Sequence, residues 1–301
     1  MSTRPLSGLA IVITLALCAS WAGQQIAIKW ALADMGPLTQ GAVRSTGAAL
    51  LVGLYAWFTL GRRGWIPGLN VPGLVCGLIF SFEFLLIFEA VARTDAARVI
   101  LYAYTAPFLV AVGGHFFIPG ERLDLKSSLG VVIAFAGVAF AIRPAATTTE
   151  VSFAGDLMAL AGGMAWGLTT LVIKGSALRT GPPAQVLFYQ LGVSVPIFWV
   201  AFMLSGESLE GPYAPLTLAS VGYQIFWVAS ISYGIWFALI ARFSATSLHV
   251  ITFTTPLMGV ALGMLVLDEK LLPQHLIAAV AVALGILLVS LPRAAPEGAS
   301  S

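Results

Sequence analysis

The two halves of this chain repeat each other at a nearly constant offset, and this repeat constrains the fold more than any other feature. A tryptophan followed by a lysine eight residues later occurs as Trp21 and Lys29, and again as Trp166 and Lys174. Further matching pairs are Pro37 with Pro182, Gln40 with Gln185, Pro107 with Pro256, Glu121 with Glu269, and Gly137 with Gly285. Two similar halves predict a pseudo-symmetric fold whose functional site lies between the repeats.

The composition places the chain in a membrane. Of its 301 residues, 59% are hydrophobic and only 9% are charged, against about 25% charged in an ordinary soluble domain. No water-soluble fold could hide so much apolar side chain, so we expect an integral membrane protein. A membrane protein built from two repeats is typical of a transporter. The formal net charge of +2 is too small to indicate a nucleic-acid partner.

Both cysteines, Cys18 and Cys76, lie inside apolar runs. This favours small packed thiols over a disulfide or a metal site, and we expect neither a metal nor a cofactor. Arg4 followed by an apolar stretch resembles a signal peptide. Because many more apolar stretches follow, the first one is interpreted as a transmembrane helix.

Ten apolar stretches are candidates for transmembrane helices. A bilayer core of about 30 Å needs roughly 20 residues of helix, and only the fifth stretch is short. The stretches lie near residues 9–33, 38–60, 71–92, 96–117, 127–143, 153–177, 183–204, 216–241, 245–267 and 273–291. We therefore predict an all-α integral membrane protein with ten transmembrane helices. Its two five-helix repeats are expected at 1–146 and 147–301, the second with a short C-terminal tail.

Basic residues indicate how the chain crosses the membrane. If both termini are cytoplasmic, nine lysines and arginines fall on the cytoplasmic side and five on the outer side, as the positive-inside rule requires. Arg44 is expected near the outer end of the second span. Because five is an odd number of spans, the second repeat must insert upside down, which is the inverted-repeat arrangement.

Two helix faces carry polar and aromatic residues at the depth of the bilayer midplane. Each begins with a tryptophan, a residue that otherwise prefers the membrane interface. The faces are Trp21, Gln24, Gln25 and Ile28 in the first half, and Trp166, Thr169, Thr170 and Ile173 in the second. One interpretation is a central cavity lined by both faces, and the other is hydrogen bonding between packed helices. The repetition of the pattern favours the cavity.

The third span carries a carboxylic acid at mid-depth, Glu83, directly after Phe82. An acid at that depth is costly and is a candidate functional residue. Three roles stay open: contact with a substrate amine, a proton relay, or a structural partner of a polar face. In the second half Ser232 takes the matching position, followed by Tyr233, so the carboxylate occurs in one half only. This asymmetry favours a specific role.

Other charges in the spans have simpler interpretations. Glu89 and Arg93 are four residues apart, the spacing of an ion pair on one helix. No group of several arginines and lysines converges at mid-depth, as a phosphate site would require. The candidate site residues are aromatic and neutral-polar with one acid, which indicates an amphipathic or aromatic metabolite, including one with an ammonium group.

Proline interrupts two spans at related positions, Pro107 and Pro256. A proline inside a helix removes a hydrogen bond and kinks the helix, so the two are candidates for gating hinges; static curvature is the alternative. Tyr104 precedes Pro107 by three residues and is expected to face the kinked region. His249 is a candidate proton site, although a simple hydrogen-bonding role is favoured. Coupling to protons through Glu83 or His249 and passive facilitation both stay open.

The pattern resembles the EamA-type transporters of the drug/metabolite transporter superfamily. The resemblance covers nearly the whole chain and rests on these positions: Ala92 to Ala97 before the fourth span, Ala106-Pro107, Gly120-Glu121-Arg122-Leu123, Gly137-Val138, Ala245, Pro256, Asp268-Glu269-Lys270-Leu271 and Gly285-Ile286. It implies a ten-helix exporter of metabolites in the bacterial inner membrane that works by alternating access.

Within that superfamily, the branch of aromatic amino-acid exporters is similar in its site residues. The matching positions here are Phe82 with Glu83, Tyr104, and Trp166. Ala106 departs from that branch, where a bulky aromatic residue can precede the proline, and this widens the expected range of amino acids.

The predicted function is therefore export of aromatic and other neutral amino acids and related metabolites. The partners are expected to be these small molecules and membrane lipid. The alternative within transporters is export of cationic or aromatic drugs, with Glu83 as the cation partner. An intramembrane enzyme or a scaffold is disfavoured, because the chain lacks a phosphate-binding loop and the motifs of metalloproteases and serine hydrolases.

Overall fold

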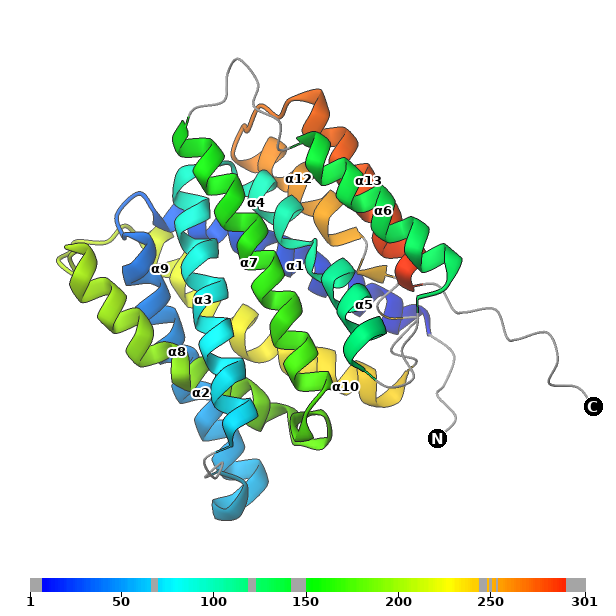
Figure 1. Ribbon diagram of the computed structural model, residues 1–301. Coiled ribbons are helices and arrows are strands. Elements are labelled where there is room, and N and C mark those ends of the chain that lie inside the picture. The colour runs from blue at the N-terminus through cyan, green and yellow to red at the C-terminus, as the bar shows by residue number, and fades with distance from the viewer. Residues whose placement is uncertain are drawn as a thin grey trace, which may run out of the picture.

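The computed structural model of this protein describes residues 7–65, 70–118, 123–141, 150–243, 248, 251, 252 and 254–290. His249 and the pair Glu121 and Arg122 lie outside the described residues. The described part of the chain is helical, with no β-strand (Figure 1). Its elements are α1 Gly8–Ala31, α2 Pro37–Trp65, α3 Val71–Arg93, α4 Ala96–Ala103, α5 Ala106–Phe117, α6 Leu125–Ala141, α7 Glu150–Lys174, η1 Ala177–Thr180, α8 Pro183–Ser205, α9 Pro215–Gly222, η2 Tyr223–Ser232, α10 Tyr233–Arg242, α12 Thr254–Val266 and α13 Pro273–Ser290.

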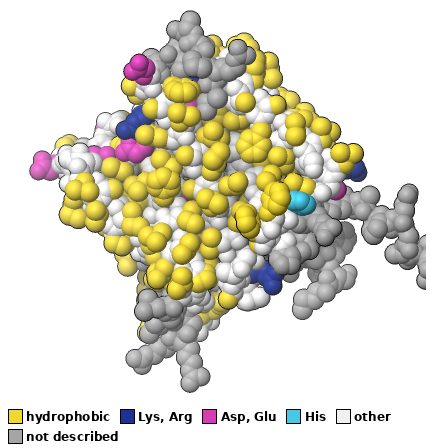
Figure 2. Space-filling model, viewed as in Figure 1, with side chains coloured by type: hydrophobic (Ala, Val, Ile, Leu, Met, Phe, Trp, Pro, Cys, Tyr) yellow, Lys and Arg dark blue, Asp and Glu magenta, His cyan; other side chains and the backbone are white. Residues whose placement is uncertain are grey.

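The predicted fold class is confirmed. Seven helical segments in the described residues are long and apolar enough to cross a membrane, and the shorter apolar helices α6, α12 and α13 supply three more spans. The fourth span is divided into α4 and α5, and the eighth into α9, the π-helix η2 and α10. On the face drawn in Figure 2, hydrophobic side chains cover the middle and charged side chains lie towards the edges, as lipid contact requires.

Local chemistry explains where the helices begin and end. The Ser7 side chain accepts a hydrogen bond from the Ala10 amide at the start of α1, and Asn70 caps α3 in the same way. Proline occupies the first turn of α2, α3, α8, α9 and α13, where its missing N–H costs no hydrogen bond. Gly206 ends α8 with φ +74°, a left-handed conformation that favours glycine.

Contacts between the halves follow a two-fold pattern. When each span is exchanged with the span five places along the chain, the main contacts between the two halves map onto one another. The pair α3 and α7 corresponds to η2 and α1, the pair α3 and α8 to η2 and α2, and the pair α1 and α12 to α7 with α4 and α5. The pairs α2 with α8, α4 with α12, and α6 with α13 each correspond to themselves. A pseudo-two-fold axis between two five-span units produces such self-complementary contacts.

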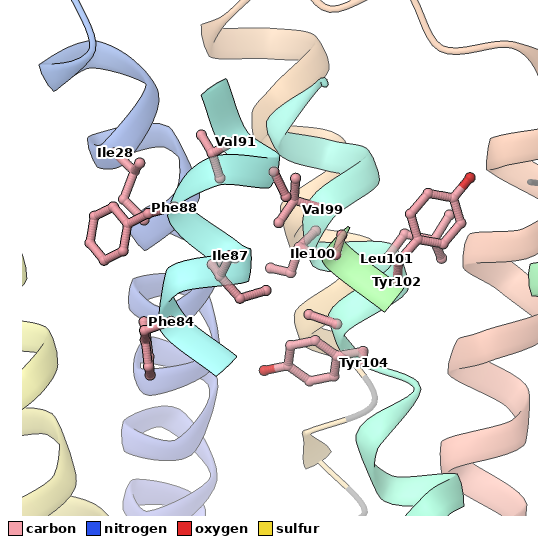
Figure 3. Packing of buried hydrophobic residues seen from close by; sticks show 14 of the residues in the cluster. Ile28, Phe84, Ile87, Phe88, Val91, Val99, Ile100, Leu101, Tyr102 and Tyr104 are labelled. Atoms are coloured by element: carbon pink, nitrogen blue, oxygen red, sulfur yellow. The ribbon is translucent and has the colours of Figure 1, made fainter. Parts of the chain in front are cut away.

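The core lies where α3 and α4 meet α1 (Figure 3). The side chains of Ile28, Phe84, Phe88 and Ile100 pack there and are at most 7% exposed. Small residues let the surrounding helices approach closely. A Cβ atom added at Gly77 would lie 2.6 Å from the Tyr189 carbonyl oxygen, and one at Gly259 would lie 2.4 Å from the Ile100 side chain. These two glycines therefore serve helix packing.

At one end of the molecule, acidic side chains of one half cap helices of the other. Glu207 accepts hydrogen bonds from the amides of Leu38 and Thr39 at the start of α2. Asp34 accepts from the Ala214 amide and the Thr217 hydroxyl at the start of α9. We call this the capped end, defined by residues 31–37, 94–96, 205–215 and 267–273. A carboxylate there also meets the positive end of the helix dipole.

A third cap and a lysine complete the capped end. Glu269 accepts hydrogen bonds from the amides of Ala96 and Ala97 at the start of α4, at 2.6 and 3.0 Å. Burial raises the pKa of the Glu269 carboxyl group, an effect opposed by those two amides. Lys29 donates hydrogen bonds to the carbonyl oxygens of Val91 and Thr94 at the end of α3. Side chains thus satisfy several backbone groups at helix ends of both halves at this end.

Candidate functional site

The fourth span breaks directly before Pro107. Tyr104 ends α4, and Pro107 is in the first turn of α5, because proline has no N–H to continue the α4 hydrogen-bond ladder. Pro256 similarly lies in the first turn of α12, and Thr252 before it is in a turn. Both predicted interruptions are present in the described residues. Each leaves the N-terminus of a half-helix inside the protein, an arrangement found at transporter binding sites.

Tyr104 points from the break into the space beside α3. In Figure 3 its hydroxyl group is directed towards the side of Phe84, whereas Tyr102 points the other way. The Tyr104 ring contacts the Trp166 indole of α7 edge-on, with centroids 5.4 Å apart and planes at 82°. The break and the predicted midplane tryptophan of the second half therefore meet. Trp166 keeps 36% of its surface exposed, so this pair is not sealed by other described side chains.

The two threonines predicted beside Trp166 bond within their own helix. The Thr169 hydroxyl donates to the Ala165 carbonyl oxygen and the Thr170 hydroxyl to that of Trp166, both at 3.1 Å. Such bonds to the preceding turn satisfy a hydroxyl without a ligand. The geometry thus favours the local interpretation for Thr169, which is buried, and leaves Thr170 at the partly exposed rim.

Trp21, the matching tryptophan of the first half, lies in a different aromatic pair. Its indole N–H donates to Ser232 Oγ at 3.0 Å, and its ring stands edge-on to Trp236 with centroids 5.4 Å apart. Ser232 ends the π-helix η2, whose wider turn is a frequent feature of functional segments. Trp21 and Trp166 each anchor one half, and each holds one aromatic partner at the same centroid distance.

Two opposite charges are buried on α2 and α3. Glu83 of α3 is 7% exposed and Arg44 of α2 is 1% exposed. The Arg44 guanidinium lies 4.1 Å from the centroid of the Phe84 ring, so a cation–π contact covers one of its faces. The Glu83 carboxyl group and the Arg44 guanidinium interact electrostatically, and Tyr233 of α10 interacts with both. Tyr104 interacts in turn with Tyr233, and we call Arg44, Glu83, Tyr104 and Tyr233 the central cluster.

Both charges retain unused hydrogen-bonding atoms. Nε and Nη1 of Arg44 and Oε2 of Glu83 are buried without a partner. The ion pairs among the described residues are Glu89–Arg93, Asp95–Arg98 and Arg98–Asp156. The predicted pair of Glu89 with Arg93 is confirmed. Arg44 and Glu83 form no direct ion pair with each other. Unpaired charges inside a membrane protein are costly and mark functional sites.

Sequence reasoning did not select Arg44 as a site residue. It lies two turns into α2, at the end of the span where it was expected, but it is fully buried. The available indication was a lone arginine within an otherwise apolar stretch. The two glutamines of α1, Gln24 and Gln25, are buried as well, both at 8% exposure, and Oε1 of Gln25 has no partner.

Phe82 lies outside the central cluster. Its side chain is 56% exposed and lines an apolar hollow of about 430 Å³ on the outer side of α3 and α7, with Leu78, Ile79, Ala161, Met164, Ala165 and Leu168. Neighbouring residues of a helix point about 100° apart, and here Glu83 is buried whereas Phe82 is largely exposed. A second hollow, of about 300 Å³, lies between α1, α9 and α12 and is lined mainly by apolar residues. Neither hollow includes a residue of the central cluster.

Comparison with known proteins agrees with this architecture. The model of the EamA-like transporter family matches residues 8–143 and again residues 153–291. An Escherichia coli (strain K12) protein named "Probable amino-acid metabolite efflux pump" is 27% identical over 288 residues, 91% of this chain and 92% of that protein. Its namesake in Salmonella typhimurium is 27% identical over 279 residues, 88% of this chain and 89% of that protein. A solved crystal structure with 21% sequence identity superposes with a TM-score of 0.65, covers 93% of this chain and 94% of its own, and shows a shared fold.

Proposed function

Since this chain belongs to the EamA-like transporter family, and is a multi-pass membrane transporter rather than an enzyme, we propose that it exports amino acids. The substrates are aromatic and other neutral amino acids and related metabolites. Export across the bacterial inner membrane proceeds by alternating access, with both termini in the cytoplasm. The names of the Escherichia coli and Salmonella relatives support amino-acid metabolites as the substrate class.

The central cluster is the observation that carries this proposal. It joins α2, α3 and the end of α4 in the first half to α10 of the second, and Tyr104 connects it to Trp166. Aromatic faces, hydroxyl groups and buried charges within one region suit a molecule with an apolar side chain and a charged end. Substrate contacts are assigned to Trp166 and Tyr104. Trp21, Gln24 and Gln25 of α1 are assigned further contacts with the substrate. Pro107 and Pro256 serve as hinges between the half-helices.

Flux into proteoliposomes tests this function. The purified protein is expected to move labelled phenylalanine or threonine faster than vesicles prepared without protein. Flux indistinguishable from such vesicles for every one of the twenty amino acids contradicts the proposal. Running the assay with and without a pH gradient also separates proton coupling from passive facilitation.

Export of cationic drugs is the second candidate, since Glu83 Oε2 is buried without a partner. It predicts that Glu83→Gln abolishes protection of cells against quaternary ammonium compounds. The nearby Arg44 guanidinium disfavours this candidate, because a second cation in the same low-dielectric region is repelled.

A further inference from the structure

We infer that the substrate site is a two-point clamp for a zwitterion, in which Arg44 binds a carboxylate and Glu83 binds an ammonium group of the same molecule. This inference rests on the proposed function and specifies its substrate chemistry. It depends on the unpaired buried atoms of both side chains. It assigns a ligand role to Arg44, which sequence patterns did not select.

Burial makes an unpaired arginine informative. Arg44 is 1% exposed, and its guanidinium is covered on one face by Phe84 at 4.1 Å. A cation–π contact stabilises the charge from above the plane and leaves the in-plane N–H groups for another acceptor. The planar guanidinium matches a carboxylate, to which it can donate two parallel hydrogen bonds. Nε and Nη1 are buried and unused, so donors remain available in the plane.

A purely structural pair would look different. Two buried opposite charges gain most when they form a direct, fully hydrogen-bonded ion pair, and a partner removed from such a pair leaves a costly charge. Arg98 and Asp156 form a direct ion pair in this protein, with Thr94 Oγ1 donating to Asp156 Oδ1 at 2.9 Å, although Nε of Arg98 has no partner. Arg44 and Glu83 interact electrostatically but form no direct ion pair. Arg44 is therefore available for the negative end of a ligand, and Glu83 for its positive end.

The two-fold pattern supports a site that distinguishes two ends. At the offsets of the sequence repeat, Arg44 corresponds to Tyr189 and Glu83 to Ser232, both uncharged. The two charges therefore occur in the first half only, on neighbouring helices α2 and α3. A symmetric pocket could not orient a molecule with unlike ends, whereas this arrangement fixes which end of an α-amino acid faces which helix. Tyr104 and Trp166 then lie where an aromatic side chain would stack.

In this structure the two charges are closed off from the surface. Such a state is expected of an occluded site in a protein that opens alternately to either side. The ligand exchanges the hydration of its charged ends for the two side chains, so a molecule with only one charged end would leave the other side chain unpaired. That penalty, rather than added attraction, gives the selectivity.

Competition in proteoliposomes tests the clamp on the unmodified protein. Counterflow of labelled L-phenylalanine is measured against unlabelled phenylalanine, 2-phenylethylamine, which lacks the carboxylate, and 3-phenylpropionate, which lacks the amine. Each single-charge analogue is expected to compete about tenfold or more weakly than phenylalanine. Equal competition by either analogue overturns the clamp while amino-acid export stands. Absence of phenylalanine and all other amino-acid flux removes the proposed function itself.

Variants assign the two ends. Arg44→Gln is expected to abolish the preference for phenylalanine over 2-phenylethylamine, and Glu83→Gln the preference over 3-phenylpropionate. Arg93→Gln, which changes a partly exposed arginine paired on its own helix, is the matched control and should keep both preferences. If Arg44→Gln does not fold, Arg44→Lys retains the charge without the planar fork and should weaken the preference. If either Arg44 variant keeps the wild-type preference for phenylalanine over 2-phenylethylamine, Arg44 does not bind the carboxylate and the assignment is wrong.

Discussion

The Tyr104 ring stands edge-on to the Trp166 indole, with ring centroids 5.4 Å apart and planes at 82°. The contact joins the end of α4, at the break before Pro107, to the middle of α7. Two elements that are expected to move during transport therefore share an aromatic contact next to the buried charges.

Replacement of Trp166 by alanine is expected to reduce amino-acid flux about tenfold. It removes the edge-to-face contact and the indole surface that packs on Tyr104, which are together worth more than about 1 kcal/mol. Flux in proteoliposomes with equal amounts of folded protein measures the effect. Leu168→Ala, two residues away on the outer face of α7 with 46% exposure, is the control. Equal flux in both variants would remove Trp166 from the site.

The hydrogen bond from Trp21 to Ser232 is expected to couple α1 to the end of η2. At 3.0 Å it joins residues 211 positions apart in the sequence. A double-mutant cycle with Trp21→Phe and Ser232→Ala should give a coupling free energy of about 1 kcal/mol. Reversible unfolding in mixed micelles supplies the four stabilities. Additive effects of the two changes would contradict a contribution from this bond.

Loss of the Arg98–Asp156 pair is expected to destabilise the protein strongly. Asp156 is 0% exposed and Arg98 is 8% exposed, so Asp156→Asn leaves a buried guanidinium with only the Asp95 carboxylate at 3.9 Å, and losing the buried partner is expected to cost about 3–5 kcal/mol. Glu89→Gln is the comparison, because its pair with Arg93 is partly exposed and should contribute at most about 1 kcal/mol. Thermal unfolding in detergent measures the destabilisation by each variant. Similar shifts in melting temperature for Asp156→Asn and Glu89→Gln would contradict this prediction.

The cap at Asp34 is expected to make stability depend on pH in the acid range. Hydrogen bonds from the Ala214 amide and the Thr217 hydroxyl hold the pKa of Asp34 below its ordinary value of 3.8. A lowered folded-state pKa stabilises the fold above the unfolded-state pKa, and this contribution is lost as pH falls through the folded value. The melting temperature of wild type should therefore exceed that of Asp34→Asn by a constant margin from about pH 5 to 7, and the margin should shrink below about pH 4. A margin that grows on acidification contradicts the cap.

Thiol labelling is expected to place the capped end outside the cell. Cys18 and Cys76 are both buried, so a membrane-impermeant reagent should leave the native protein unmodified. Ser208→Cys, in the exposed loop after α8, should react in intact cells, and Arg179→Cys, in η1, only after permeabilisation. Reaction of both variants in intact cells would show that the orientation is wrong.

Local patterns predicted the spans and several contacts. Long apolar stretches must form helices in lipid, because only a helix satisfies its own backbone there. The break before Pro107 follows from a missing N–H, and the pairing of Glu89 with Arg93 follows from helix spacing. Each of these depends on residues within about one helical turn of each other, which a sequence displays directly.

Contacts between distant helices decided the rest. The burial of Arg44 depends on Phe84 of another helix, and the π-helix η2 is held by Trp21, far along the chain. The pairing of Phe82 with Glu83 in one site was expected from resemblance, but adjacent helix positions diverge by about 100°. The hydroxyls of Thr169 and Thr170 donate hydrogen bonds within their own helix. The sequence shows which residues are present, but it does not show which face of each helix packs against another helix.

The caps at Asp34, Glu207 and Glu269 each reach from one half of the protein into the other. With the capped end outside the cell, as proposed, an outward-open state requires these carboxylates to leave the helix ends that they hold, and water must then hydrate each of those helix ends. The three acids would thus hold that side of the transporter closed. Weakening these hydrogen bonds would raise the population of the outward-open conformation, with no change in the residues that contact the substrate.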